Sequence, residues 1–103
     1  MSESNAMPSQ GSSPSTAREA TISNRRGLHA RAAAKFVKVC ALFDAQVQVS
    51  HRGNEVSGMS IMGLMMLAAA PGCVILLSST GPQSEDVLEA LIDLIDRKFD
   101  EDD

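Results

Sequence analysis

The chain has 103 residues, 44% of them apolar, which fits a single domain with one modest hydrophobic core. A formal net charge of −4, with three Phe and no Trp or Tyr, argues against the basic surface and aromatic stacking platform of a nucleic-acid-binding protein. No apolar run approaches the roughly 20 residues that span a bilayer and there is no signal-peptide pattern, so we expect a cytoplasmic protein with no membrane partner.

The N-terminal residues 1–17 are mostly small and polar, with almost no bulky apolar side chains. Such a segment cannot offset the entropy lost on ordering, so we predict a disordered tail. We expect the folded domain at residues 18–100, followed by an acidic end at residues 101–103 that frays into solvent.

The first half of the domain predicts a strand, a helix and a β-hairpin. A short β-like run at residues 20–23 ends in a polar turn. Residues 30–42 place apolar side chains on one face at helical spacing. Residues 45–50 alternate apolar and polar side chains, as a half-buried strand does, and a short returning strand begins at residue 55.

The second half predicts a helix, a strand and a final helix. Ser60 is a suitable N-cap for a helix at residues 61–69 that is apolar nearly all round. The apolar run at residues 73–77 predicts a central strand, and Ser84 is placed to cap a last helix. The order β-α-β-β-α-β-α predicts an α+β fold, an open-faced β-sandwich in which a four-stranded, mostly antiparallel sheet carries three helices on one face.

Three side chains with reactive chemistry receive structural interpretations. Cys40 and Cys73 lie in apolar runs without a CxxC motif or a Cys/His cluster, so we predict buried thiols, no disulfide, no metal site and no cofactor. A thiol enzyme would need a thiolate beside a histidine, which makes it the weaker alternative. His51 lies in a polar turn, where we expect a solvated ring without a functional role.

The segment around His29 has the features of an anion site. Gly27 lies two residues before it, and a run of alanines, the best helix formers, follows it. His29 is therefore expected at a helix N-terminus, where unpaired backbone N–H groups and the helix dipole favour anions. Arg31 adds a planar cation suited to phosphate oxygens. Together these groups indicate a place that holds a phosphoryl group on a histidine.

Two motifs resemble those of HPr, the histidine-containing phosphocarrier family of the phosphotransferase system. Residues 27–31, Gly-Leu-His-Ala-Arg, resemble its active-site segment, and residues 60–65, Ser-Ile-Met-Gly-Leu-Met, resemble its regulatory-serine segment. The resemblance covers roughly residues 18–100 and implies the same fold. Ala32 stands where the family usually has proline, and Met59 where lysine is common. Because proline there only pre-organises the helix, alanine should keep the helix start.

The resemblance also implies a function, that of a phosphoryl carrier which does not turn over as an independent enzyme. Enzyme I, charged from phosphoenolpyruvate, would phosphorylate His29, on Nδ1 in the family, and the phosphoryl group would then pass to a histidine of a IIA-type protein. Arg31 would stabilise the phosphate. Besides capping its helix, Ser60 would be a target of an HPr kinase/phosphorylase. The C-terminal residues resemble the nitrogen-related, NPr-like branch more than the sugar-transporting one, and we expect a monomer.

A partner-docking surface is expected beside His29. Its predicted apolar part consists of Leu28, Met62, Leu64 and Met65. Its predicted basic rim for acidic partners consists of Arg25, Arg26, Arg31 and Lys35. An alternative of a different class is a regulatory binding module that is never phosphorylated and docks through the Met-rich helix at residues 60–69.

Overall fold

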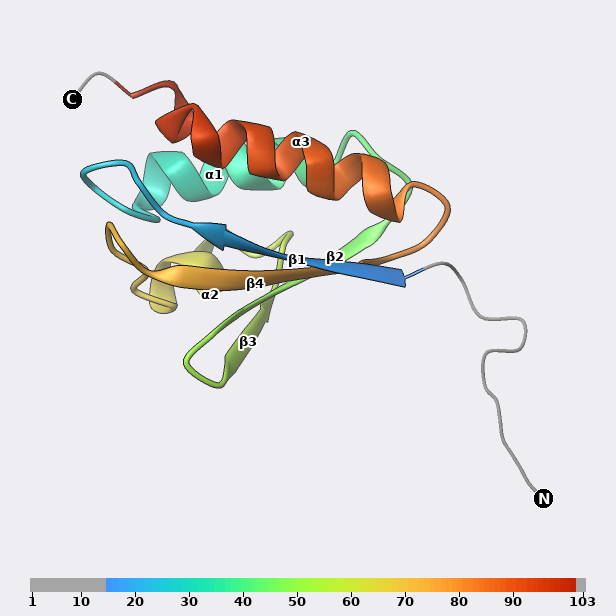
Figure 1. The fold of residues 1–103 in the computed structure, drawn as a ribbon, viewed down its shortest axis with the longest axis horizontal. Helices are drawn as coiled ribbons and strands as arrows, with labels where there is room; N and C mark the ends of the chain where they lie inside the picture. Colours follow the sequence, from blue (N-terminus) through green and yellow to red (C-terminus); the bar gives the residue numbers. More distant parts are fainter. Residues whose placement is uncertain (1–14, 102–103) are drawn as a thin grey trace.

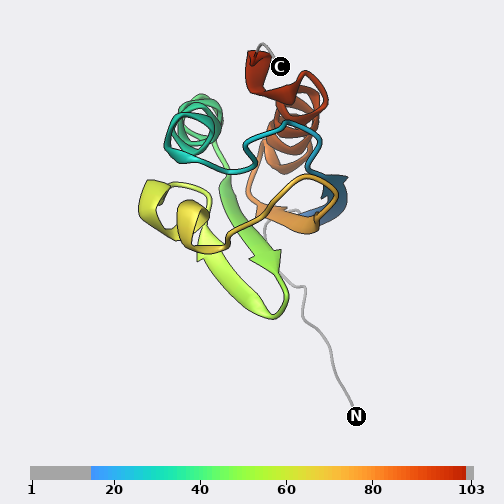
Figure 2. The same ribbon diagram turned by 90° about the vertical axis from the view of Figure 1, so that its left-hand side faces the viewer.

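The structure is a computed structural model that describes residues 15–101. In chain order its elements are β1 (Ser15–Thr21), α1 (Ala30–Cys40), β2 (Gln46–His51), β3 (Asn54–Ser57), α2 (Ile61–Met66), β4 (Val74–Thr80), α3 (Ser84–Asp96) and the short 3₁₀ helix η2 (Lys98–Asp100). The sheet is a single layer, and α1, α2 and α3 lie on the same side of it (Figures 1 and 2). The predicted fold class is confirmed.

The sheet has the strand order β1-β4-β2-β3, and every neighbouring pair is antiparallel. The predicted central strand is therefore confirmed as β4, which pairs with β1 on one side and β2 on the other. Its side chains alternate, with Ile75 and Leu77 buried against the helices and Val74 and Leu76 exposed. The apolar run at residues 73–77 is unbroken because both faces of β4 carry apolar side chains, including the exposed outer face.

The core lies between the helices and the inner face of the sheet. Phe36 of α1, Leu64 of α2 and Leu91 of α3 are fully buried there, against Val49 and Leu77 of the sheet. Burying each such side chain contributes roughly 1.5–3 kcal/mol. This packing fixes the start of α1 relative to the loops around it.

The folded part begins earlier than predicted. β1 starts at Ser15, three residues inside the segment expected to be disordered, because Ser15–Ala17 pair with residues 78–80 of β4. Backbone pairing orders these residues although their side chains are small and polar. The rest of the predicted tail, residues 1–14, lies outside the described residues.

Two helix boundaries also differ from the prediction. α2 ends at Met66 instead of residue 69, because Ala68 adopts a left-handed backbone conformation with φ of 54°. Ser84 lies within the first turn of α3, buried, and the residue before it, Gln83, occupies the N-cap position without a side-chain hydrogen bond. The predicted capping role of Ser84 is therefore wrong.

The C-terminal segment packs onto the domain instead of fraying at residue 101. Phe99 is fully buried, and its carbonyl oxygen accepts a hydrogen bond from Lys35 Nζ at 2.6 Å. Lys98, Phe99 and Asp100 all have φ between 56° and 59°, and left-handed backbone costs roughly 1–2 kcal/mol per residue. The turn returns the chain toward the start of α1, where Glu101 is bound. Residues 102 and 103 lie outside the described residues.

No helix between residues 15 and 101 is long and apolar enough to cross a membrane.

Candidate functional site

His29 is the N-cap residue of α1, as the sequence predicted. Its backbone is extended (φ −76°, ψ 178°), and its carbonyl oxygen accepts the hydrogen bond from the Ala33 N–H at 2.8 Å. Its ring nitrogen Nδ1 accepts a hydrogen bond from the Arg31 N–H at 3.3 Å. Ala32 is inside α1 and fully buried, so alanine does keep the helix start. Nδ1 therefore faces the donor end of the helix, where an anion is favoured.

The loop before His29 is held against the segment that follows α2. Gly27 has φ of +66°, and a Cβ at this position would overlap the carbonyl oxygen of Ala69. The same oxygen accepts the Leu28 N–H at 3.1 Å. The close approach requires glycine and fixes the entry of the chain into α1.

The imidazole is bound on its other side by Glu101, a residue that the sequence analysis missed. Nε2 of His29 hydrogen-bonds to Oε2 of Glu101. Oε1 of Glu101 accepts a hydrogen bond from Asn24 Nδ2 at 3.1 Å, and the same nitrogen donates to the Gly27 carbonyl at 2.9 Å. The side chains of His29 and Glu101 are only 15% and 12% exposed.

The contacts of Glu101 keep its carboxylate ionised, and this determines which nitrogen of the His29 ring carries a proton. Burial opposes ionisation, but hydrogen bonds from His29 and Asn24, together with the charges of His29 and Arg26, outweigh it and lower the pKa of Glu101. An ionised carboxylate only accepts hydrogen bonds. Nε2 must therefore carry the proton of this hydrogen bond, while Nδ1, which accepts the Arg31 N–H, is the unprotonated ring nitrogen.

The predicted basic residues surround this site but differ in their roles. Arg25, Arg26 and Arg31 are exposed, and within residues 15–101 the guanidinium of Arg31 makes no hydrogen bond or ion pair. Lys35, in contrast, is half-buried and donates to the Phe99 carbonyl. Within residues 15–101 the Arg31 guanidinium is thus exposed and unpaired, and the Lys35 ammonium is not.

Ser60 caps α2, as predicted. Its hydroxyl accepts a hydrogen bond from the Gly63 N–H at 2.9 Å. A Cβ at Gly63 would come within 2.9 Å of the Ser60 Oγ, so glycine leaves room for the cap. Ser60 is partly exposed, and the preceding Met59 is exposed.

Two of the four residues predicted for the apolar docking surface, Leu28 and Leu64, are buried in the core and cannot contact a partner. For Leu64 the reason is that α2 packs one face of its six residues against α1 and β3. Met62 and Met65 are exposed, Met62 by 67%. The exposed side chains of this region, here called the methionine patch, are Met59, Ile61, Met62, Met65 and Met66.

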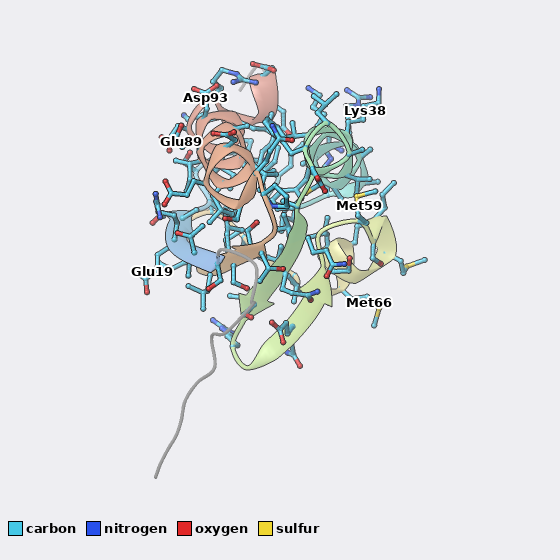
Figure 3. The ribbon with its side chains drawn as sticks, turned by 90° about the vertical axis from the view of Figure 1, so that its right-hand side faces the viewer. Glu19, Lys38, Met59, Met66, Glu89 and Asp93 are labelled. Atoms are coloured by element: carbon cyan, nitrogen blue, oxygen red, sulfur yellow. The ribbon has the colours of Figure 1, made fainter. Side chains whose placement is uncertain are left out.

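The charges are unevenly distributed around the patch. In Figure 3, Met59 and Met66 project from the region of α2, with Lys38 of α1 on the same side. Glu19, Glu89 and Asp93 lie on the opposite side, on β1 and α3. An acidic partner would therefore approach more favourably from the side of α1 and α2.

Other reactive side chains are structural. His51 is buried and its Nδ1 hydrogen-bonds to the Leu67 carbonyl at 3.0 Å, so the expected solvated ring is wrong: the turn folds under the end of α2. Burial raises the pKa of the Cys40 thiol to about 12, which keeps it protonated and unreactive near neutral pH. Cys73 is partly buried and also has a free thiol.

The chain is similar to known phosphocarrier proteins over almost all of the described residues. The family model described as the PTS HPr component phosphorylation site matches residues 16–97. The phosphocarrier protein HPr of Pseudomonas putida is 51% identical over 86 residues, which cover 82% of this chain and 96% of that protein. The phosphocarrier protein NPr of Shewanella violacea is 39% identical, covering 82% and 92%. The crystal structure of HPr from Thermoanaerobacter tengcongensis has a TM-score of 0.80 at 40% identity, covering 84% of this chain and 98% of that one.

Proposed function

The chain belongs to the HPr family of phosphocarrier proteins of the phosphotransferase system, and from this premise we propose that Nδ1 of His29 carries the phosphoryl group. The observation that carries the proposal is the orientation of the ring. Nδ1 faces the N-terminus of α1 as an unprotonated acceptor of the Arg31 N–H, while Nε2 is bound to a carboxylate. We further propose that enzyme I is the donor and that a histidine of a IIA-type protein is the acceptor.

The proposed reaction is an in-line displacement at phosphorus. The Nδ1 lone pair of His29 forms the new N–P bond, while the N–P bond of the donor phosphohistidine breaks and its electron pair returns to the donor ring. Such a reaction needs positioning and neutralisation of phosphoryl charge more than covalent chemistry from the protein. The amides at the start of α1 and the Arg31 guanidinium supply donors and positive charge.

The methionine patch is the proposed docking surface for both partners. Methionine side chains adapt to different partner surfaces, which suits a carrier that must bind a donor and an acceptor in turn. Arg25, Arg26 and Arg31 are exposed and form the basic rim. Opposite charge on the partner would speed the encounter without requiring a permanent complex.

Ser60 is a proposed regulatory site for an HPr kinase/phosphorylase. A phosphate on its hydroxyl would lie at the N-terminus of α2, between Met59 and Ile61 of the methionine patch. About two added negative charges would suit the helix end but oppose burial of the patch against a partner. Modification would therefore weaken docking and leave the fold intact.

A binding module that is never phosphorylated is the second candidate, because the methionine patch alone could hold a regulatory partner. That function predicts unchanged partner affinity and unchanged output in His29→Ala. The carrier function predicts that His29→Ala still binds enzyme I but accepts no phosphate.

The test is incubation with phosphoenolpyruvate and an active enzyme I from the same organism, followed by intact-mass measurement before and after mild acid. The carrier function predicts a gain of one phosphate that acid removes and that is absent in His29→Ala. No gain of mass would overturn the carrier function and favour the binding module.

A further inference from the structure

We propose that Glu101, held in place by Asn24, is a positioning residue that keeps the His29 ring in the tautomer with a protonated Nε2 and an unprotonated Nδ1. The inference rests on the proposed function, because it assigns the attacking nitrogen of the carrier histidine. It concerns a residue at the far end of the chain, separated from His29 by 72 positions.

The first support is the geometry of the three side chains. Each oxygen of the Glu101 carboxylate has its own donor, His29 Nε2 on Oε2 and Asn24 Nδ2 on Oε1. Asn24 is fully buried, and its amide nitrogen also donates to the Gly27 carbonyl. The reversed amide would place its oxygen against that carbonyl and the carboxylate, so only this orientation of Asn24 is favourable.

The second support is that a buried asparagine occupies position 24 although one of its polar atoms, Oδ1, has no hydrogen-bond partner in residues 15–101. A buried, unpaired polar atom is unfavourable, and native structures contain few of them. The two donations from the amide nitrogen, one of them to Glu101, give a reason for asparagine at this position.

The third support is the way in which the chain delivers Glu101 to the site. The left-handed residues Lys98, Phe99 and Asp100 reverse the chain after α3. Burial of Phe99 and the hydrogen bond from Lys35 to its carbonyl hold that turn in place. Strained backbone persists where surrounding contacts determine it and is enriched at functional sites. Here it directs a carboxylate onto the one ring that the proposed function uses.

The contact matters chemically during phosphoryl transfer. When Nδ1 of the neutral ring forms its bond to phosphorus, the proton stays on Nε2 and the ring becomes cationic. The ionised Glu101 then lies beside this cation, as a carboxylate does beside the imidazolium of a hydrolytic triad. Glutamine at this position would not neutralise the ring, and its amide nitrogen would face one of the two donors, His29 Nε2 or Asn24 Nδ2.

The test is the tautomer of His29 in the full chain without any partner, measured from the ¹⁵N chemical shifts and two-bond ¹H–¹⁵N couplings of the ring at alkaline pH. The wild-type protein should show a protonated Nε2 and an unprotonated Nδ1. Glu101→Ala, Glu101→Gln and Asn24→Ala should each shift both ring nitrogens toward a mixture of tautomers. Glu89→Ala, which truncates an exposed glutamate on α3 that makes no contact with His29, is the matched control and should leave the pattern unchanged.

The result that would overturn the inference is a wild-type tautomer pattern in Glu101→Ala that remains folded by its amide spectrum. Because no phosphoryl donor is present, this outcome is independent of whether enzyme I phosphorylates the chain. In the presence of enzyme I, Glu101→Ala should lower the maximal rate of phosphoryl gain roughly tenfold. Its concentration for half-maximal rate should change little, because the Glu101 side chain is only 12% exposed and is not part of the methionine patch.

Discussion

At the scale of single residues, the site depends on one glycine that no other residue can replace. Gly27 combines a positive φ with contact against the Ala69 carbonyl, and the next residues place His29 at the start of α1. The close approach and the backbone conformation act together. A side chain at this position would therefore move the loop that orients the imidazole.

Gly27→Ala should lower the free energy of unfolding by about 2 kcal/mol or more, because left-handed strain adds to the clash with the Ala69 carbonyl. Urea unfolding measures the change. Gly53→Ala is the matched control: φ is +83° there, but nothing lies within 4 Å of the added Cβ, so only the strain of about 1–2 kcal/mol should remain. Equal losses in the two variants would contradict the role given to the Ala69 contact.

Glu101 also makes the stability of the fold depend on pH. Since the folded structure lowers the pKa of Glu101 below its ordinary value of 4.5, unfolding at acid pH is accompanied by proton uptake. The contribution of Glu101 is fully present above pH 4.5 and is lost as the pH falls through the folded pKa. The stability difference between wild type and Glu101→Ala should therefore be larger at pH 7 than at pH 3 in urea unfolding. A difference that grows toward pH 3 would contradict this.

At the scale of elements, the short helix α2 depends on its cap more than a longer helix would. It has only six residues, and the Ser60 hydroxyl satisfies the Gly63 N–H. Few intrahelical hydrogen bonds are available to stabilise six residues, so a side-chain acceptor at the N-terminus has a large relative effect.

Ser60→Ala should lower the free energy of unfolding by about 1 kcal/mol, because the Gly63 N–H loses its acceptor. Ser60→Asp should retain most of the stability, since aspartate is also a good N-cap. Thermal unfolding compares the two. Equal destabilisation by alanine and aspartate would show that the cap hydrogen bond is not what holds α2.

Helix starts that depend only on neighbouring residues could be predicted from the sequence. The start of α1 at Ala30 and the Ser60 cap follow from residues within one helical turn. What local pattern could not predict depends on distant partners. β1 begins at Ser15 through pairing with β4, and Leu28 is buried although it lies in a loop. In the sequence, Glu101 belongs to an acidic C-terminal end that is typical of a solvated segment. The one local signal that this end packs on the domain is the apolar Phe99, two residues earlier, which is buried in the structure.

At the scale of the whole molecule, the methionine patch and the acidic side chains of α3 lie on different sides. The methionine patch and Lys38 are on the side of α1 and α2, and Glu89 and Asp93 are on α3 on the other side (Figure 3). A net charge of −4 therefore does not describe the surface that a partner meets. Local charge and apolar area decide docking.

Met62→Glu should raise the concentration of carrier that gives half-maximal phosphorylation by enzyme I roughly tenfold, because it places a charge in the centre of the methionine patch. The maximal rate should change little, since His29 and Glu101 are untouched. Glu89→Gln on the opposite side is the control and should behave as wild type. Steady-state phosphorylation rates at several carrier concentrations measure both quantities, and an equal effect of the two substitutions would contradict the assigned surface.

The most direct measurement of the central claim is the position of the phosphate on the His29 ring. The ¹⁵N-labelled chain, phosphorylated by enzyme I and phosphoenolpyruvate, would be studied by two-bond ¹H–¹⁵N correlation of the imidazole. Because Nδ1 is unprotonated and faces the helix N-terminus, while Nε2 is bound to Glu101, we predict phosphate on Nδ1 and a proton on Nε2. Phosphate on Nε2, or on any residue other than His29, would contradict the account.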